Sequence, residues 1–232
     1  MQAIYLLSGL LCDATVWKTQ VKALEQQGYM VKPLSFQGFD SLTDMAKHVL
    51  EQAPQRFSLA GHSMGGRVAL EVYRQAPERI ERLALLDTGY EPAGAEEPEK
   101  RGVLVNKALT QGIASIAETW ARPMLAETRQ DDNELLNSIL RMVGRMSGEI
   151  YAGQTRALLT RPDATALLSE IRCPTFVICG KQDTWSPPQR HQQMHERIPD
   201  SELRLIDDCG HMSTMERPNE VLSILMEWLT KS

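Results

Sequence analysis

A serine in the setting of a nucleophile stands at residue 63, between a predicted strand and a predicted helix. It lies in the pentapeptide GHSMG, which matches the pattern G-x-S-x-G. A tight turn from strand to helix projects the serine hydroxyl, and the two glycines leave room for that turn. Backbone amides at the start of the helix favour negative charge. The motif therefore predicts that Ser63 acts as a nucleophile.

Serine needs a base to remove its proton, and His211 is the best placed of the five histidines. It stands in the loop after the last predicted strand, on the same carboxyl edge of the sheet as the serine. His48, His191 and His195 fall on polar faces of predicted helices, so we expect them at the surface. The sharp turn should direct the side chain of His62 elsewhere. His211 is therefore the predicted general base.

An acid that orients the imidazole completes this chemistry. Asp183 comes directly after the preceding predicted strand, and Asp87 ends an earlier strand on the same edge. Asp208 is too close in sequence to His211, and it is better explained as a residue that orders the loop. We favour Asp183 as the acid and keep Asp87 as the alternative. The order along the chain is then nucleophile, acid and base, unlike the orders of chymotrypsin-like and subtilisin-like enzymes.

Two preorganised N–H donors are needed to hold the negative charge that develops on an attacked carbonyl oxygen. One is expected from the backbone amide of Met64, directly after the nucleophile. The other is expected from the loop after the first strand, where we favour Leu10 and keep Leu11 as the alternative. This chemistry requires no metal ion and no organic cofactor.

Short apolar runs, interpreted as buried strands, alternate with amphipathic runs, interpreted as helices, in both end portions of the chain. The expected strands are 3–7, 30–34, 57–60, 83–87, 175–179 and 203–206, and the expected helices are 17–27, 42–52, 65–75, 188–197 and 220–229. This alternation predicts right-handed crossovers and a parallel sheet with helices on both faces.

The alternation stops between residues 90 and 169. A segment rich in Pro, Gly, Ala and Glu at 90–100 predicts a loop. Helical patterns follow at 103–109, 113–125, 133–145 and 150–159. We expect a core of 1–89 and 170–232 with a helical cap, 90–169, over the carboxyl ends of the strands. The alternative is a set of helices packed on one side without a gating role.

Apolar side chains near these loops and in the cap are expected to form a substrate pocket. These candidates are Leu11, Trp120, Met124, Trp185 and Met212. Four cap arginines are candidates for binding a substrate carboxylate or phosphate, although solvated ion pairs explain most such residues. These arginines are Arg122, Arg141, Arg145 and Arg156.

Composition narrows the class of protein. The 232 residues fit one domain with a substantial core, and 42% of them are hydrophobic. A net charge of -5 argues against nucleic-acid binding and against electrostatic attachment to anionic membranes. The apolar N-terminus lacks the basic start of a signal peptide, and no apolar stretch is long enough to span a membrane. We therefore expect a cytoplasmic protein.

The four cysteines show neither a CxxC motif nor the Cys/His spacing of a metal site. We expect isolated reduced thiols in or near the core. Cys12 and Cys209 stand beside the motifs described above and are candidates for lining the pocket, but not for the nucleophile.

The combined motifs resemble the α/β-hydrolase superfamily over nearly the whole chain. They are LSGL followed by Trp17, GHSMGG, ICGKQDTWSP and DCGHMSTMERP. The resemblance implies a six-stranded, mostly or wholly parallel sheet, because the chain begins at the strand usually numbered third. Ser8 stands where the first loop of the family often has histidine. The sequence is similar to small bacterial carboxylesterases of the pimeloyl-carrier methyl esterase and enol-lactonase type.

We therefore expect a serine hydrolase that cleaves a carboxylic ester of a small molecule through an acyl-enzyme. An acyl thioesterase acting on a carrier-bound group, a carbon–carbon bond hydrolase and a lyase similar to the menaquinone-pathway synthase are alternatives on the same triad. A ligand receptor without activity is an alternative from another class. Dehalogenase and epoxide hydrolase activities are disfavoured, because their nucleophile would be aspartate where this chain has Ser63.

Overall fold

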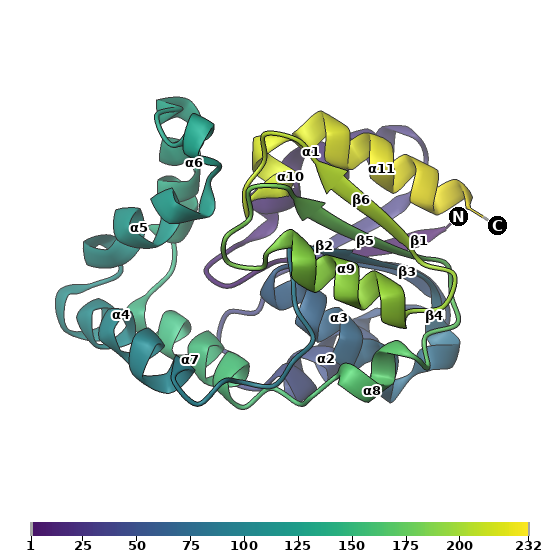
Figure 1. Ribbon diagram of the computed structural model, residues 1–232, viewed down its shortest axis with the longest axis horizontal. Helices are drawn as coiled ribbons and strands as arrows, with labels where there is room; N and C mark the ends of the chain where they lie inside the picture. The colour runs from purple at the N-terminus through teal and green to yellow at the C-terminus, as the bar shows by residue number, and fades with distance from the viewer. Residues whose placement is uncertain (1, 232) are drawn as a thin grey trace.

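A six-stranded sheet forms the centre of the protein (Figure 1). The computed structural model describes residues 2–231. The strands are β1 (Ala3–Leu7), β2 (Met30–Leu34), β3 (Phe57–His62), β4 (Ile80–Leu86), β5 (Thr175–Gly180) and β6 (Glu202–Ile206). They lie in the order β2-β1-β3-β4-β5-β6, and all neighbouring pairs are parallel. The predicted fold class is confirmed.

Burial along the strands follows their place in the sheet. Every residue of β1, β3 and β5 is buried. Parallel strands covered on both faces are typically such continuous apolar runs. The edge strands β2 and β6 are partly exposed along most of their length. The site described below is built on the buried central strands.

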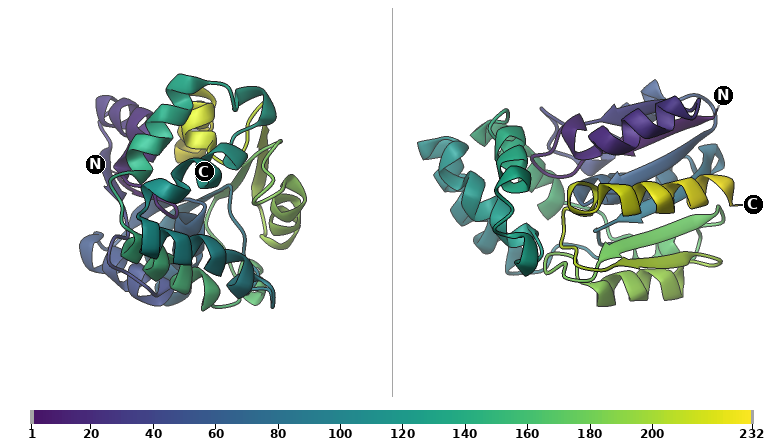
Figure 2. Two further views of the ribbon diagram at one scale, coloured as in Figure 1. Left: turned by 90° about the vertical axis from the view of Figure 1, so that its left-hand side faces the viewer. Right: turned by 90° about the horizontal axis from the view of Figure 1, so that it is seen from above.

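Helices cover both faces of the sheet (Figures 1 and 2). They are α1 (Lys18–Gln26), α2 (Leu42–Gln52), α3 (Met64–Gln75), α9 (Pro188–Arg197), α10 (Ser213–Glu216) and α11 (Pro218–Thr230). The chain runs from β1 to one edge strand and then reverses toward β6, so right-handed crossovers place α1 on the face opposite α2 and α3. The last helix, α11, returns to pack beside α1.

A helical insertion lies between β4 and β5, beyond the carboxyl ends of the strands (Figure 1). The helices beyond these ends are α4 (Glu97–Gln111), α5 (Ala114–Ala121), α6 (Asn133–Val143) and α7 (Gly148–Leu159). The short α8 (Thr165–Leu168) follows them and lies beside the core, below α9 in Figure 1. The division into a core of 1–89 and 170–232 and a cap of 90–169 stays a prediction. Met1 and Ser232, the first and last residues of the predicted core, lie outside the described residues. None of the helices in residues 2–231 combines the length and apolar character needed to cross a membrane.

The predicted loop at residues 90–100 is wrong in its last part, because α4 begins at Glu97. Proline occupies the first turn of this helix together with Glu97 and Glu99. Proline lacks the N–H that has no partner there, and carboxylates favour the positive end of the helix dipole. The same composition that marks a loop therefore also marks a helix start.

The backbones of β3, α3 and β1 approach one another closely at two glycines. A Cβ atom on Gly61 would lie 2.2 Å from the carbonyl oxygen of Gly65. A Cβ atom on Gly65 would lie 2.2 Å from the carbonyl oxygen of Leu7 in β1. Only glycine fits at these positions, so the start of α3 lies directly against the sheet.

Replacing Gly65 should therefore destabilise the fold. We expect Gly65→Ala to lower the free energy of unfolding, measured by urea denaturation, by about 3 kcal/mol, because backbone atoms must move apart. Gly102→Ala in α4 is the matched control, since its Cβ would meet no atom within 4 Å. Alanine there should raise stability by up to about 1 kcal/mol. Equal effects of the two substitutions would contradict the close approach.

Candidate active site

Ser63 stands at the turn where β3 ends and α3 begins, with φ 56° and ψ -118°. A non-glycine residue with positive φ is strained, and such strain persists only where surrounding contacts hold it. The amide of Ser63 donates to the carbonyl oxygen of Leu86 at 2.9 Å. Its own carbonyl oxygen accepts a hydrogen bond from Thr88 Oγ1 at 2.6 Å. Contacts to the end of β4 thus hold the turn in place.

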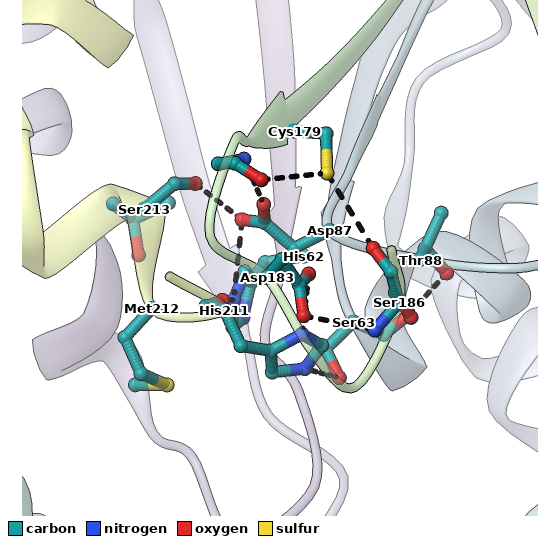
Figure 3. Close-up of polar contacts among 12 residues, drawn as sticks. His62, Ser63, Asp87, Thr88, Cys179, Asp183, Ser186, His211, Met212 and Ser213 are labelled. Carbon is teal, nitrogen blue, oxygen red and sulfur yellow. Dashed lines mark hydrogen bonds and ion pairs between the residues drawn. The ribbon is translucent and has the colours of Figure 1, made fainter. Parts of the chain in front are cut away.

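His211 and Asp183 meet Ser63 at the carboxyl edge of the sheet (Figure 3). His211, in the loop after β6, places Nε2 2.9 Å from Ser63 Oγ. Its Nδ1 lies 2.8 Å from Oδ2 of Asp183, which follows β5. The arrangement can take a proton from the serine hydroxyl and stabilise the resulting imidazolium.

Both charged forms of the His211–Asp183 pair are favoured. Burial alone would lower the pKa of His211, but the charge and hydrogen bond of Asp183, together with the charges of Asp87 and Glu216, raise that pKa above its ordinary value. Burial alone would raise the pKa of Asp183, but the charge and hydrogen bond of His211 hold it below 3.8. Asp183 Oδ1 also accepts hydrogen bonds from the amides of Trp185 and Ser186, both at 2.8 Å. Asp183 is therefore fixed as an anion behind the imidazole.

Asp87, the alternative acid, has other partners. Its Oδ1 accepts from the amide of Gly180 at 3.0 Å, and its Oδ2 accepts from the hydroxyl of Ser213. The nearest histidine nitrogen is Nε2 of His62, 3.7 Å away. Burial raises the pKa of Asp87 well above its ordinary value, and the charge of Asp183 adds to the rise. The geometry joins Asp183, and not Asp87, to the imidazole of His211.

One cluster in residues 2–231 has the residue types of a metal site: potential ligand atoms of Asp87, Cys179 and Asp183 lie within 4.8 Å of one another. Burial raises the pKa of the Cys179 thiol, and the charge of Asp87 adds to the rise, whereas a metal ligand would be a thiolate. The thiol already donates toward the carbonyl oxygens of Gly180 and Ser186 at 3.2 and 3.4 Å. The donor set fits a hydrogen-bonded core better than a metal site.

The amides of Leu10 and Met64 line the same cavity as Ser63. Neither amide donates a hydrogen bond to another group in the described residues. The amide of Leu11, the alternative donor, is occupied, because it donates to Oε1 of Gln154 at 2.9 Å. The arrangement favours Leu10 over Leu11 as the second donor to an oxyanion.

A cavity of about 190 Å³ opens on Ser63 and His211. Of the apolar wall residues predicted from the sequence, Met124 and Trp185 line it. The other three, Leu11, Trp120 and Met212, do not line it, because each packs into the hydrophobic core with at most 1% of its surface exposed. A contact of these three side chains with a substrate stays a prediction.

Two histidines outside the catalytic arrangement have structural partners. The expectation that His191 lies at the surface is wrong: it is fully buried, and its Nε2 accepts from the amide of Thr88 at 2.9 Å. His62 points away from the serine hydroxyl, and its Nε2 donates to the carbonyl oxygen of His211 at 2.8 Å. Burial lowers the pKa of both His62 and His191 to about 4, so both rings are neutral at pH 7.

All four cysteines are free thiols. Neither Cys12 nor Cys209 lines the cavity, since both are buried in the core. Burial, with the nearby charge of Asp13, raises the pKa of Cys12 to about 12, which keeps it an unreactive thiol.

The loop carrying His211 is attached to the insertion. The amide of His211 donates to the carbonyl oxygen of Met124 at 2.6 Å. The buried carboxylate of Glu216 accepts from the amides of Ala126, Gly210 and Met212 at 2.9–3.1 Å. Sequence reasoning missed Glu216, because its position five residues after His211 does not distinguish it from the exposed glutamates of α11.

The cap arginines predicted to bind an anion do not reach the cavity. Arg122 pairs with Glu118 on α5, Arg145 with Asp13, and Arg156 with Asp40. Arg141 does not line the cavity either. The arginines that do line it are Arg67, Arg101, Arg161 and Arg190, which stand in segments that sequence reasoning did not connect with the site.

Comparisons with known proteins found relatives in sequence and in fold. The sequence pattern of the alpha/beta hydrolase family matches residues 4–224. The chain is 25% identical to the pimeloyl-[acyl-carrier protein] methyl ester esterase of Nitrosomonas europaea over 95% of this chain and 92% of that protein. A thermophilic esterase from Thermogutta terrifontis, solved with malate bound, has a TM-score of 0.89 at 29% identity, covering 99% of this chain and 89% of that one. The enol-lactonase from Burkholderia xenovorans LB400 shares the fold, with a TM-score of 0.86 at 23% identity over 99% of this chain and 92% of its own.

Removing the Glu216 carboxylate should destabilise the protein. Glu216→Ala leaves three backbone N–H groups without an acceptor, so we expect the free energy of unfolding to fall by about 3 kcal/mol or more. Glu220→Ala, at an exposed position in α11, is the control and should change stability by at most about 1 kcal/mol. Chemical denaturation of both variants measures the difference. Similar values for the two would show that Glu216 does not stabilise this loop.

Proposed function

Because the chain belongs to the α/β-hydrolase family and acts on esters or related substrates, we propose that it cleaves carboxylic esters through an acyl-enzyme on Ser63. The membership confirms the resemblance drawn from the sequence. The observation that carries the proposal is the continuous contact from Ser63 Oγ to His211, at 2.9 Å, and from His211 to Asp183, at 2.8 Å. A serine, an imidazole in its neutral form and an ionised carboxylate in this order generate a nucleophile at pH values above the pKa of the imidazole.

The proposed reaction has two halves. In the first, Nε2 of His211 takes the hydroxyl proton as Ser63 Oγ attacks the ester carbonyl, and the amides of Leu10 and Met64 hold the oxyanion. The carbon–oxygen bond to the alcohol then breaks, and His211 gives its proton to the leaving oxygen. In the second half, water attacks the acyl-enzyme with His211 again as base. The carboxylic acid leaves, and the proton returns to Ser63.

The cavity favours a small substrate. Its volume of about 190 Å³ lies below the range of roughly 300–1,000 Å³ typical of pockets that bind drug-sized molecules. The indole of Trp185, whose ring centre lies 6.0 Å from that of His211, forms one wall beside the reacting atoms. Short acyl and alcohol groups are therefore the proposed substrates.

An ester attached to an acyl carrier is a second candidate. It is favoured by the relative from Nitrosomonas europaea, which is named for a methyl ester on pimeloyl-acyl carrier protein. The same triad would cleave such an ester with methanol as the leaving group, and the carrier would remain outside the cavity.

Replacing the nucleophile should abolish hydrolysis. For p-nitrophenyl esters from acetate to decanoate, we expect Ser63→Ala to lower kcat at least about 10⁴-fold, while the variant stays folded by circular dichroism. The wild-type protein should favour the short acyl chains. Ser169→Ala, at an exposed serine after α8, is the matched control and should keep full activity. Activity retained in Ser63→Ala would rule out the acyl-enzyme mechanism.

Removing the carboxylate of Asp183 should change both kcat and the pH dependence of kcat/KM. Because His211 must be neutral to act as base and the carboxylate of Asp183 raises its pKa, kcat/KM should rise as the pH increases through the pKa of His211. We expect Asp183→Asn to lower kcat about 10⁴-fold. The midpoint of the rise should also move to lower pH, because burial then acts without the opposing carboxylate. A larger loss in Asp87→Asn than in Asp183→Asn would assign the acid role to Asp87.

A further inference from the structure

Four guanidinium groups line one side of the cavity that contains Ser63. They come from three parts of the chain: Arg67 from α3, Arg101 and Arg161 from the insertion, and Arg190 from α9. Two carboxylates pair with arginines of this group, those of Glu91 and Glu97. This wall therefore carries an excess of positive charge in a protein whose net charge is -5.

Three of the four arginines already have ion-pair partners. Arg161 binds both carboxylate oxygens of Glu97, and its remaining donors reach three backbone carbonyls. Arg101 also pairs with Glu97, at 3.1 Å, and Arg190 pairs with Glu91 at 3.0 Å. These contacts fix the wall, and Arg161 has no nitrogen left for another ligand.

Arg67 differs from the other three. Its Nη1 donates to the carbonyl oxygen of Glu91 at 2.9 Å, and among residues 2–231 it makes no other hydrogen bond and no ion pair. Burial lowers the pKa of Arg67 to about 9, and the charge of Arg161 adds to the decrease. The charges of Glu91 and Glu97 act on Arg67 from a distance, but neither carboxylate lies within ion-pair distance of it. A half-buried cation without a directly paired carboxylate favours a bound anion at this position.

The place of Arg67 relative to the nucleophile is set by α3. Arg67 lies in the first turn of α3, four residues after Ser63, and its amide donates to the carbonyl oxygen of Ser63 at 3.4 Å. Both side chains line the cavity. At the cavity wall, a Cβ atom on Gly89 would lie 2.6 Å from Nη2 of Arg67. Glycine at this position leaves space for the guanidinium edge beside the cavity.

We propose that the cavity binds an anionic group of the substrate, a carboxylate or a phosphate, through the free edge of Arg67. The inference rests on the proposed function, because it assumes that the ester carbonyl reacts at Ser63. Guanidinium binds carboxylate and phosphate oxygens by paired hydrogen bonds, and Arg101 and Arg190 add positive potential. Since one helical turn of about 5.4 Å separates the two positions, only a few bonds separate the anionic group from the ester carbonyl.

Matched pairs of substrates test whether the enzyme prefers an anionic substrate and whether the preferred anion is a carboxylate or a phosphate. Monomethyl glutarate and methyl pentanoate differ in a carboxylate, and methyl 4-phosphonooxybutanoate and methyl 4-methoxybutanoate differ in a phosphate group. We expect the wild-type protein to have a kcat/KM about ten- to a hundredfold higher for the anionic member of one pair. The favoured pair identifies the carboxylate or the phosphate as the source.

Variants of Arg67 test whether this residue causes the preference for an anionic substrate. Arg67→Met should lose the ratio between anionic and neutral substrate, and Arg67→Lys should recover part of it because the charge returns. Arg145→Met, at an exposed arginine paired with Asp13, is the matched control and should keep the ratio. A preference that is unchanged in Arg67→Met would overturn the proposal.

Binding measured without turnover separates this proposal from the proposed function. Glutarate and inorganic phosphate are titrated calorimetrically into Ser63→Ala protein and into protein that also carries Arg67→Met. Binding of either anion only to the first protein supports the subsite, even if the wild type hydrolyses none of the esters. If neither anion binds and the wild type prefers neither anionic substrate, the subsite is rejected while the ester hydrolase remains.

Discussion

The backbone turn at Ser63 is the constraint that positions the rest of the site. It holds a non-glycine residue at φ 56°, and it is possible only because glycines at 61 and 65 let α3 begin in contact with the sheet. The turn directs the hydroxyl outward and brings the amide of Met64 beside it. It also sets Arg67 in the first turn of α3, where the amide of Arg67 donates to the carbonyl oxygen of Ser63. The nucleophile, one oxyanion donor and the unpaired cation therefore share a single rigid element.

Backbone strain is concentrated at the edge of the sheet where these groups lie. Residues 2–231 contain five non-glycine residues with positive φ. Four of them, at positions 11, 63, 87 and 208, follow the carboxyl ends of β1, β3, β4 and β6. Such conformations persist only where neighbouring contacts fix them. The amides of Ser63 and Asp87 donate to carbonyl oxygens of the adjacent strands, those of Leu86 in β4 and Ile178 in β5. The sheet thus supplies the rigidity that keeps the reacting side chains within hydrogen-bond distance.

The parallel sheet also explains why part of the site could be predicted from the sequence. Carboxyl ends of parallel strands meet at one edge, so identifying the strands was enough to bring Ser63, Asp183 and His211 together. Six strands and the helical insertion were predicted in the correct order. The burial of His191, the role of Glu216 and the place of Arg67 were not predicted, because each depends on how separate segments pack. Spacing along one helix does not reveal which face another segment covers.

Contacts between the insertion and the His211 loop limit how a cap could move. The carbonyl of Met124 accepts from the amide of His211, and a Cβ atom on Gly210 would lie only 2.4 Å from that same oxygen. The carboxylate of Glu216 joins Ala126 to the same loop. Moving residues 124–126 away from the core would break these hydrogen bonds and release the loop that holds the imidazole. Any opening that preserves the catalytic arrangement must therefore occur elsewhere in the insertion, with this segment remaining attached to the core.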